Sequence, residues 1–590
     1  MSKPIRTVED LKGAEAAGLR TLYPEKLKVL VGSASCGLAV GAGAVEAAAI
    51  ASVKELGLDA TVARTGCIGF CSQEPLLDLV LPNGPRISYA NMTPEKTRSL
   101  LAAYAKDGDL LPDLALGRFT SEEHILTGEA HVYPASQKAP DAIPEWSMLD
   151  FFSRQQKVIL RSCGSIDPLS ITEAIARGSY RGAMRAIQEM SQDGVIDEVI
   201  NSGLRGRGGA AFPTGQKWRF ASKAAGDMKY VVCNADEGEP GACMDRTVLE
   251  GDPHAIREGM LIGAFAIGAR EGFVYVRNEY PLAIATLQTA IDEAEKYGLF
   301  GDDILGSGWS FRIQIRVGAG AYICGEETAL LESIEGAAGE PRSRPPYPVT
   351  SGLWGCPTVV NNVKTWASVA PIITRGSAWY AGMGTRSTRG TTVFSLEGAV
   401  KNTGLVEIPF GLSLREMIYG IGGGIPGERP LKAVQAGGAA RGCIPPTFLD
   451  LTIDMEDRAG ESLMIGTGGI IVLDDRACMV DMARYLVGFF LEESCGKCVP
   501  CREGLRQMAG IMDRICEGKG SEADLLLLER LAGTMKAAAV CGLGGMAPSA
   551  VMTNLTHFRS EFEAHIHDKH CSAGVCRGLT RHGTATAKTN

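Results

Sequence analysis

The sequence lacks three features that would place the protein in a simple class. No apolar stretch approaches the roughly 18 residues of a transmembrane helix, and the longest, 259–269, is far too short. The first ten residues are charged and contain no apolar segment, so we expect no secretory signal. The 59 lysine and arginine residues do not outnumber the 68 aspartate and glutamate residues, which argues against a nucleic-acid partner. These absences predict a cytoplasmic protein that is not inserted in a membrane.

Aromatic residues are also scarce, at 6%, so the cores must consist mainly of Ala, Val, Ile and Leu. Glycine, in contrast, accounts for 73 of 590 residues and lacks the three-residue period of collagen. This excess indicates many tight turns and places where the backbone approaches a ligand closely. At about 150 residues per domain, the length predicts about four domains.

The 17 cysteines do not form the disulfide framework of a small secreted domain, because the chain is long and shows no signal segment. Clustered cysteines in a reducing compartment indicate metal or redox sites instead. One cluster contains Cys36, Cys67 and Cys71. The other contains Cys495, Cys498, Cys501, Cys541, Cys571 and Cys576.

Apolar periodicity predicts several α/β units. Within 26–105 we expect strands at 28–32, 59–64 and 76–81 and helices at 44–56 and 94–105. A linker is expected to follow over 106–148. Over 150–375 we expect helices at 171–190, 195–200, 254–269 and 281–296 and strands at 229–234, 272–277 and 311–317, and this alternation is typical of α/β architecture. Residues 390–475 are richer in strand signals, and 476–568 read as a helix bundle. We expect the last twenty residues to be without regular structure.

A glycine-rich segment spans 203–218. Gly206, Gly208 and Ala211 match the dinucleotide-binding pattern G-x-G-x-x-G/A, which must follow a strand and open a helix. Here a predicted helix precedes the segment, and Pro213 lies inside the would-be helix, so the Rossmann interpretation fails. The remaining hypothesis is a loop whose backbone N–H groups and neighbouring cations meet phosphate. The alternative is an ordinary glycine-rich connection.

Three polar motifs follow. Residues 233–241 place three carboxylates and an amide directly after a predicted strand, where they could bind ribose hydroxyls or a flavin ring. Residues 322–328 and 361–365 also combine small and polar side chains, and the asparagine amides offer both donors and acceptors. Each motif could equally be a solvated loop or turn.

The strongest motif contains Cys495, Cys498 and Cys501 in C-x2-C-x2-C spacing, with Cys541 forty residues further on. This spacing is typical of a 4Fe–4S cluster. Zinc is the alternative, although zinc sites usually use two C-x2-C pairs.

Five segments occur in one order: GLRGRGGAAFPTGQKW, NADEGEPG, YICGEET, NNVKT and SCGKCVPCREG. With them, residues 151–577 resemble the family of NADH-binding flavoprotein (51 kDa-type) subunits of respiratory complex I. The resemblance extends to the diaphorase subunits of NAD-linked and electron-bifurcating hydrogenases and formate dehydrogenases. It implies hydride exchange between NADH and FMN, then single-electron transfer to a 4Fe–4S cluster and onward to partner subunits. Because FMN carries the chemistry, no catalytic side chain is expected.

The resemblance implies a multidomain α/β fold. Its expected parts are a thioredoxin-like ferredoxin-type domain (1–125), a linker (126–149), a Rossmann-like FMN/NADH domain (150–385), a small ubiquitin-like (SLBB-type) α+β domain (386–474), a C-terminal helix bundle with the 4Fe–4S cluster (475–560) and a tail (561–590).

The family's binding residues carry over onto matching positions. The glycine loop and a nearby lysine would hold phosphates: Gly206, Arg207, Gly208, Gly209, Ala210 and Lys217. Residues expected around the flavin are Asn234, Asp236, Glu237, Tyr322, Gly325, Glu326, Asn361, Asn362 and Thr365. The nicotinamide nucleotide would face Phe212, Glu239 and Glu327, with its adenine between Phe220 and Tyr347.

Four positions depart from the family pattern. Ala211 stands where glycine is usual, Cys243 where phenylalanine is usual, and Tyr347 where phenylalanine is common. Lys364 stands where glutamate is usual and would change the charge beside the flavin. None of these changes removes a phosphate or flavin ligand.

The N-terminal unit resembles a thioredoxin-like ferredoxin domain that has lost one of four cysteines. Those that remain are Cys36, Cys67 and Cys71. Leu30 and Val31 occupy the place of the missing one. Three thiolates together with Ser33 or Ser35 could hold a 2Fe–2S cluster, or the domain is vestigial and holds none.

The tail resembles a junction that leads into a two-cluster ferredoxin domain in bifurcating relatives, and we expect that domain to be missing here. Cys571 and Cys576, together with Cys478 and His565, offer three thiolates and one imidazole for zinc. The alternative is free thiols on a frayed end.

The expected partners are a thioredoxin-like 2Fe–2S subunit and a further iron–sulfur or catalytic subunit of a hetero-oligomer, which would include electron-bifurcating complexes. One alternative is the diaphorase subunit of a non-bifurcating NAD-dependent formate dehydrogenase or hydrogenase. An alternative of another class is a redox-inactive zinc-binding scaffold, which would need neither the phosphate loop nor the flavin motifs.

Overall fold

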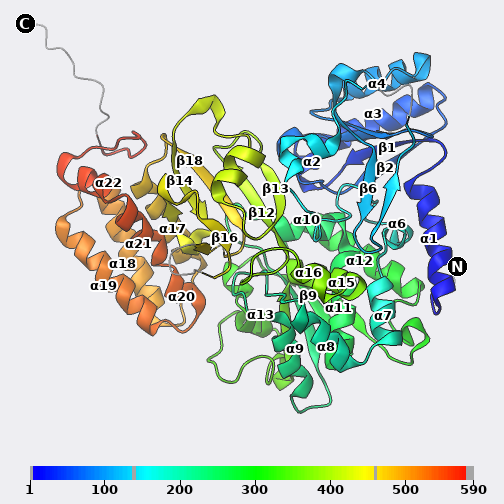
Figure 1. Cartoon of the computed structure of the whole chain (residues 1–590). Coiled ribbons are helices and arrows are strands. Elements are labelled where there is room, and N and C mark those ends of the chain that lie inside the picture. Colours follow the sequence, from blue (N-terminus) through cyan, green and yellow to red (C-terminus); the bar gives the residue numbers. More distant parts are fainter. Residues whose placement is uncertain (1–3, 136–140, 457–461, 465, 580–590) are drawn as a thin grey trace, which may run out of the picture.

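Three sheets of four or five strands organise the described part of the chain, which in this computed structural model comprises residues 4–135, 141–456, 462–464 and 466–579. The architecture is a mixed α/β arrangement in which the N-terminal unit and the C-terminal helices lie at opposite ends (Figure 1). Of the tail predicted to be without structure, 580–590 lie outside the described residues. Among the described residues, no helix combines the length and apolar character needed to cross a membrane.

The N-terminal sheet has the order β2-β1-β3-β4-β5. Its strands are β1 (Leu27–Gly32), β2 (Ala60–Thr65), β3 (Leu77–Val80), β4 (Arg86–Tyr89) and β5 (Ala115–Phe119). Strand β1 pairs parallel with β2 and antiparallel with β3. Helix α4 (Pro94–Asp107) begins where the sequence predicts, because Thr93 accepts a hydrogen bond from the Lys96 N–H and proline occupies the first turn.

Residues 106–148, predicted as a linker, contain three strands. Strand β5 completes the N-terminal sheet by pairing with β4, and β6 (Ser121–His124) forms a hairpin with β7 (Glu129–Val132). Phe119 of β5 stacks on Trp146 with ring centroids 4.6 Å apart. Strand β5 depends on a partner outside this segment, which the local composition does not reveal, whereas the hairpin of β6 and β7 is local.

The central sheet has the order β10-β9-β8-β11, and every pair in it is parallel. Its strands are β8 (Tyr230–Ala235), β9 (Glu271–Arg277), β10 (Arg312–Gly318) and β11 (Thr358–Asn362). The first three match the predicted strands, whereas β11 was not predicted. In register, Cys233 lies opposite Asn361 and Asn234 opposite Asn362. Ligands of parallel sheets bind beyond the carboxyl ends of the strands, where these side chains gather.

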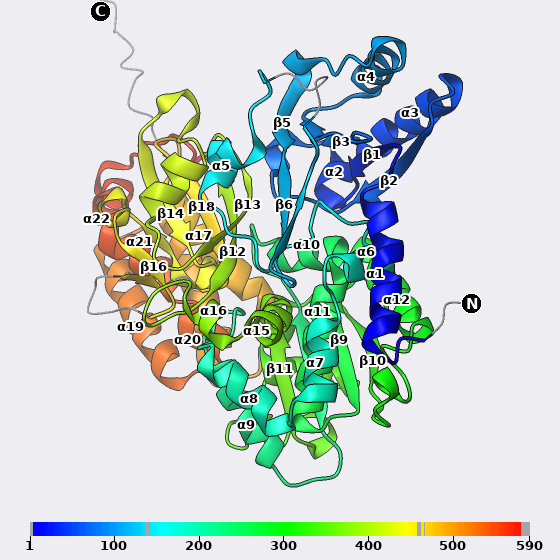
Figure 2. The same ribbon diagram turned by 45° about the vertical axis from the view of Figure 1, so that its right-hand side comes forward.

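Beyond this sheet lie a third sheet and a bundle of helices (Figure 2). The third sheet has the order β13-β12-β18-β14-β15, formed by β12 (Thr391–Gly398), β13 (Gly404–Pro409), β14 (Leu431–Ala436), β15 (Cys443–Ile444) and β18 (Gly469–Asp474). The bundle contains α17 (Met479–Glu493), α18 (Val499–Cys516), α19 (Glu522–Ala538) and α21 (Ser549–His557). Both units were predicted over these residues.

A fully buried carboxylate joins the third sheet to the segment that precedes the central unit. Glu407 of β13 accepts hydrogen bonds from the backbone N–H groups of Val158, Ile159 and Leu160 at 2.8–3.0 Å. It also accepts one from the Thr391 hydroxyl at 2.5 Å. Burial raises the pKa of Glu407, and these donors oppose that rise.

We predict that Glu407→Ala lowers the free energy of unfolding by about 3 kcal/mol, because buried N–H groups left without an acceptor each cost about 1–3 kcal/mol. Urea titration followed by far-UV circular dichroism measures the change. Glu416→Ala is the control: its ion pair with Arg154 is about half exposed, so its loss should cost less than about 1 kcal/mol. Equal effects of the two substitutions would contradict this role for Glu407.

Candidate functional site

Two adjoining cavities, of about 550 Å³ and about 640 Å³, lie at the carboxyl ends of β8 and β11. Every residue that the sequence predicted to hold FMN or NADH lines at least one of them. The wall common to both includes Gly208, Ala210, Ala211, Asn234, Gly325, Glu326, Asn362 and Gly542. The fold therefore brings together motifs that are far apart in the sequence.

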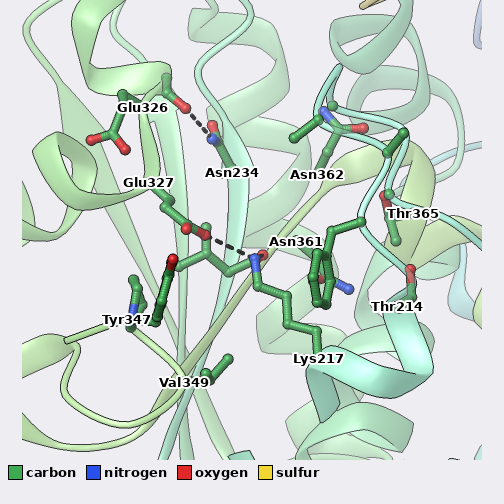
Figure 3. Close-up of a pocket in the computed structure, with 18 of the residues that line it drawn as sticks. Thr214, Lys217, Asn234, Glu326, Glu327, Tyr347, Val349, Asn361, Asn362 and Thr365 are labelled. Atoms are coloured by element: carbon green, nitrogen blue, oxygen red, sulfur yellow. Dashed lines mark hydrogen bonds and ion pairs between the residues drawn. The ribbon is translucent and has the colours of Figure 1, made fainter. Parts of the chain in front are cut away.

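Lys217 crosses the first cavity (Figure 3). It stands on α9 (Thr214–Lys223), and its Nζ donates to Glu327 Oε2 and to the Val360 carbonyl, both at 2.8 Å. Asn361 enters from β11, and its Nδ2 is buried without a hydrogen-bond partner. The cavity thus presents a cation and an unused amide donor to a ligand.

Three aromatic side chains edge the same cavity. Phe212, Phe220 and Tyr347 all line it, yet they are 48%, 50% and 55% exposed, respectively. Large apolar rings normally avoid such exposure unless a partner covers them. They offer stacking surfaces for a flat ligand ring.

The glycine loop borders both cavities. It is closed by a hydrogen bond from the Gly206 N–H to the Phe212 carbonyl at 2.9 Å. A Cβ atom at Gly208 would lie 3.0 Å from the Asn362 Cβ, so this position requires glycine for its close approach. Ala211 stands where the family that this sequence resembles usually has glycine. It adopts a φ of 55°, in the left-handed region. Helix α9 begins only after Pro213, which agrees with the rejection of the Rossmann pattern for this segment.

The side chain of Arg207 lies buried in the protein, which was not expected for a residue predicted to bind phosphate. Arg207 is fully buried, and its guanidinium donates to the carbonyls of Arg389 and Thr391 and to the Tyr380 hydroxyl. Its backbone N–H donates to Thr365 Oγ1 at 2.8 Å. The Arg207 guanidinium therefore positions the loop through hydrogen bonds to the protein itself, while Arg207 also borders the second cavity.

The second cavity is rich in carboxylates. Asp236 accepts a hydrogen bond from Arg277 at 3.2 Å, but its Oδ2 is buried without a partner, and burial raises its pKa to about 7. Glu237 caps helix α10 (Met244–Gly251) by accepting from the N–H groups of Asp245 and Arg246 at 2.9 and 3.1 Å. Burial, and then the neighbouring Asp245 carboxylate, raise the pKa of Glu237 to about 7.

Glu239 is also held by the protein itself. It accepts from the Ala439 N–H at 2.5 Å and from the Thr467 hydroxyl at 2.7 Å, and burial raises its pKa. Lys364 lies among these acids: its Nζ donates to the Thr467 carbonyl at 2.7 Å and lies 3.9 Å from Asp245 Oδ1. Its positive charge opposes the effect of burial on the pKa of Glu237, Glu239 and Asp245.

Three further residues of the site were not predicted from the sequence. Arg344 pairs with Glu326 at 2.7 Å and with Glu327 at 3.1 Å. Glu493 of α17 accepts from the Tyr322 N–H at 2.8 Å. Gly542 lines both cavities, and its position directly after Cys541 is a signal that the sequence did contain.

The predicted iron–sulfur cysteines lie at helix starts. Cys498 precedes the first turn of α18, and Cys541 precedes that of α20 (Gly542–Met546). Helix N-termini favour thiolates through their unpaired N–H groups and the helix dipole. Cys501 is 5% exposed, whereas Cys495, Cys498 and Cys541 are half-buried. In the described part of the chain, no three of these four sulfurs converge to the spacing of a single ion.

Three groups of the described residues do converge in this way: Cys478, His565, Cys571 and Cys576; Cys36, Cys67 and Cys71; and Asp481, Cys516 and Cys576, which shares Cys576 with the first. Within each group all ligand atoms lie within 4.8 Å of one another. In the tail group all four residues are buried. The structure thus brings together the tail ligands that the sequence predicted from four separate positions.

Comparison with known proteins identifies two family regions. Residues 199–371 match the Nuo51 FMN-binding domain, and residues 481–565 match the NADH-ubiquinone oxidoreductase-F iron-sulfur binding region.

Among relatives, the chain is 49% identical over 435 residues to the HndC subunit of the NADP-reducing hydrogenase of Solidesulfovibrio fructosivorans, covering 74% of this chain and 88% of that protein. It is 46% identical over 417 residues to the F 2 subunit of the NADH-quinone oxidoreductase of Rhizobium meliloti (strain 1021), covering 70% and 99%. Its fold is similar to a chain in the crystal structure of the NAD+-reducing [NiFe]-hydrogenase in the H2-reduced state, with a TM-score of 0.64, 28% identity, and 94% and 87% coverage.

We predict that Gly208→Val removes most bound FMN while the fold is retained. A branched side chain would have to displace Asn362, because even a Cβ lies 3.0 Å from the Asn362 Cβ. Flavin content of the purified protein, measured by absorbance, reports occupancy, and circular dichroism reports the fold. Gly533→Ala on α19, where a Cβ meets nothing within 4 Å, should leave both unchanged. Full FMN occupancy in Gly208→Val would refute the assignment of this loop.

Proposed function

The chain belongs to the family of NADH-quinone oxidoreductase F subunits, and we propose that its two cavities hold FMN and NADH against each other beside a 4Fe–4S cluster. It is an oxidoreductase component of a hetero-oligomer, as are its relatives. When bound, FMN would take a hydride from NADH and release single electrons. The observation that carries the proposal is the common wall of the cavities, which includes Gly542, the residue next to Cys541.

The residues present fit a flavin. Asn361 Nδ2 and Asp236 Oδ2 are buried polar atoms without partners, and each lines one cavity. Because buried polar groups are almost always paired, these two atoms are available to a ligand in the cavities. Gly208 lets the glycine loop pack closely on Asn362 of β11, so that both segments border the two cavities.

For the nucleotide, we propose that Phe220 and Tyr347 stack on the adenine and that Phe212, Glu239 and Glu327 face the nicotinamide half. Lys217 would turn from Glu327 toward a phosphate, since a phosphate is the stronger anion. Glu237 and Glu239 act mainly through the loops and helix that they hold in place.

The electron exit would be the cluster bound by Cys495, Cys498, Cys501 and Cys541. Val499 and Val540, each next to a ligand, are 58% and 48% exposed. We propose that a thioredoxin-like 2Fe–2S subunit or a further iron–sulfur or catalytic subunit approaches this face. The two lined cavities count against a redox-inactive scaffold, which would have no use for them.

We further propose the domain identities expected from the resemblance. The N-terminal sheet, with β1 parallel to β2 and antiparallel to β3, supports a thioredoxin-like unit. The parallel central sheet supports a Rossmann-like unit, and the mixed sheet of β12, β13, β14 and β18 supports a ubiquitin-like one.

We predict that Cys498→Ser leaves NADH oxidation by a hydride-accepting dye near the parent rate and stops one-electron output. The cluster lies beyond the flavin in this scheme, so its loss should not affect the first step. Steady-state assays with a dye and with a one-electron acceptor protein separate the two steps. Cys356→Ser, a half-buried thiol outside the cysteine groups, should retain both. One-electron output at the parent rate in Cys498→Ser would show that electrons leave by another route.

We also propose a zinc site in the tail. Cys478 Sγ and Cys576 Sγ lie 3.8 Å apart, and each lies 3.4 Å from His565 Nε2. A tetrahedral zinc site with bonds of about 2.3 Å to sulfur and about 2.0 Å to nitrogen requires edges of about 3.8 and about 3.6 Å. His565 Nδ1 lies 2.7 Å from the Glu561 carbonyl, which orients the ring as is usual for ligating histidines.

We predict that Cys571→Ser together with Cys576→Ser removes about one zinc ion per chain, as expected for one closed structural site. Elemental analysis of anaerobically purified protein measures the loss. FMN and the 4Fe–4S signal should persist, because neither assigned site contains these residues. Unchanged zinc content in the double variant would show that these thiols do not bind zinc.

A further inference from the structure

The N-terminal thiols are spaced for one ion. Cys67 Sγ and Cys71 Sγ lie 3.8 Å apart, and all three sulfurs, with that of Cys36, lie within 4.8 Å of one another. An ion bound tetrahedrally by thiolates at about 2.3 Å requires sulfurs about 3.8 Å apart. A two-iron cluster binds its ligands as two pairs, one on each iron, so one of three sulfurs would stand away from the other two.

A carboxylate faces this group. Glu74 is 6% exposed, and its Oε1 lies 3.9 Å from Cys36 Sγ. Its Oε2 accepts from the Leu76 N–H at 2.8 Å, so the backbone holds one oxygen while the other points to the sulfurs. In a tetrahedral site an oxygen and a sulfur ligand lie about 3.5 Å apart.

The surroundings of Glu74 are shaped for this carboxylate. A Cβ at Gly32 or at Gly37 would lie 3.1 Å from Glu74 Oε2. Within the described residues, no lysine, arginine or histidine forms an ion pair with Glu74. A buried carboxylate usually has a cation or a metal as its partner.

The two serines considered from the sequence are otherwise engaged. Ser35 donates through its hydroxyl and its backbone N–H to Glu250, at 2.6 and 2.8 Å. Ser33 donates to the Val31 carbonyl at 3.2 Å. The side chains of Leu30 and Val31, at the position of the missing cysteine, are buried and apolar.

We propose that Cys36, Cys67, Cys71 and Glu74 form a mononuclear tetrahedral site for a divalent ion of the zinc class, in place of a 2Fe–2S cluster. Three thiolates and one carboxylate oxygen are ligands that zinc accepts. The site does not depend on the flavin assignment.

The ion would fix segments of the N-terminal unit that pack against the central one, since all four proposed ligands belong to the N-terminal unit. Helix α2 (Ser35–Ala39) carries Cys36 and lies next to α10 in both views (Figures 1 and 2). Glu250, near the end of α10, binds Ser35, and Glu237 caps the other end of that helix inside the second cavity. Gly66, next to Cys67, packs so closely that a Cβ there would lie 2.3 Å from the Gly251 Cα. A metal site at this junction is therefore structural.

The test uses the full chain carrying Cys571→Ser and Cys576→Ser, so that the tail contributes no zinc. We expect about one zinc ion per chain and no 2Fe–2S signal in electron paramagnetic resonance of the reduced protein. Glu74→Gln should weaken zinc affinity, measured by competition with a chelator, by about tenfold or more. Glu55→Gln, an exposed carboxylate on α3 (Ala42–Glu55), should leave it unchanged.

Cobalt substitution gives a second readout. The parent here is the chain that carries the two tail substitutions, and it should show the absorption of tetrahedral cobalt with three thiolates. Adding Glu74→Cys should keep the ion and raise the thiolate charge-transfer intensity by about one third, since a fourth thiolate joins the site. Parent affinity in Glu74→Gln, or unchanged intensity in Glu74→Cys, would refute Glu74 as a ligand. A 2Fe–2S signal that disappears in Cys36→Ser would refute the mononuclear site. FMN and 4Fe–4S contents, measured on the same samples, report separately on the proposed function.

Discussion

The parallel pairing of β8 with β11 is the constraint on which the site depends. It sets Asn234 beside Asn362 and brings two polar motifs, far apart in the sequence, to the same edge of the sheet. The glycine loop can then pack on Asn362, because Gly208 has no Cβ to hold it away. The two cavities exist where these three segments meet, and a shift of one residue in the register would turn every second side chain away from them.

Buried charge gives the cleft its second property. Burial raises the pKa of Asp236 and of Glu237 to about 7, so near neutral pH these acids carry less negative charge than the composition of the motif indicates. Lys364 adds a positive charge among them, where the related family usually has a glutamate. Both effects make an acidic cleft more tolerant of anionic phosphates. The carboxylates also serve the scaffold, since Glu237 caps α10 and Glu239 holds the loops at Ala439 and Thr467.

Sulfur spacing separates two kinds of cysteine group in one chain. The ligands near α18 and α20 are spread over helix starts, as a multi-iron cluster requires. The tail and N-terminal groups instead bring their ligand atoms within 4.8 Å of one another, a spacing that one ion can span. On this ground we propose a single metal ion for each of these two groups, and in the N-terminal group the carboxylate of Glu74 completes the proposed ligand set.

From the sequence alone, the cluster spacing, the flavin motifs and most helices and strands could be predicted, because each rests on residues that are close along the chain. Thr93 and Pro94 start α4 by contacts within one turn, and the C-x2-C-x2-C motif contains most of its own ligand set. Strands β11 and β5 could not be predicted, since their pairing partners β8 and β4 lie in other segments of the chain, whereas the hairpin of β6 and β7 is local and was missed. The buried course of Arg207 and the approach of Glu74 to Cys36 were equally hidden. Only the folded chain decides which distant groups meet, because burial and ligand distance are properties of three-dimensional packing and not of neighbouring residues.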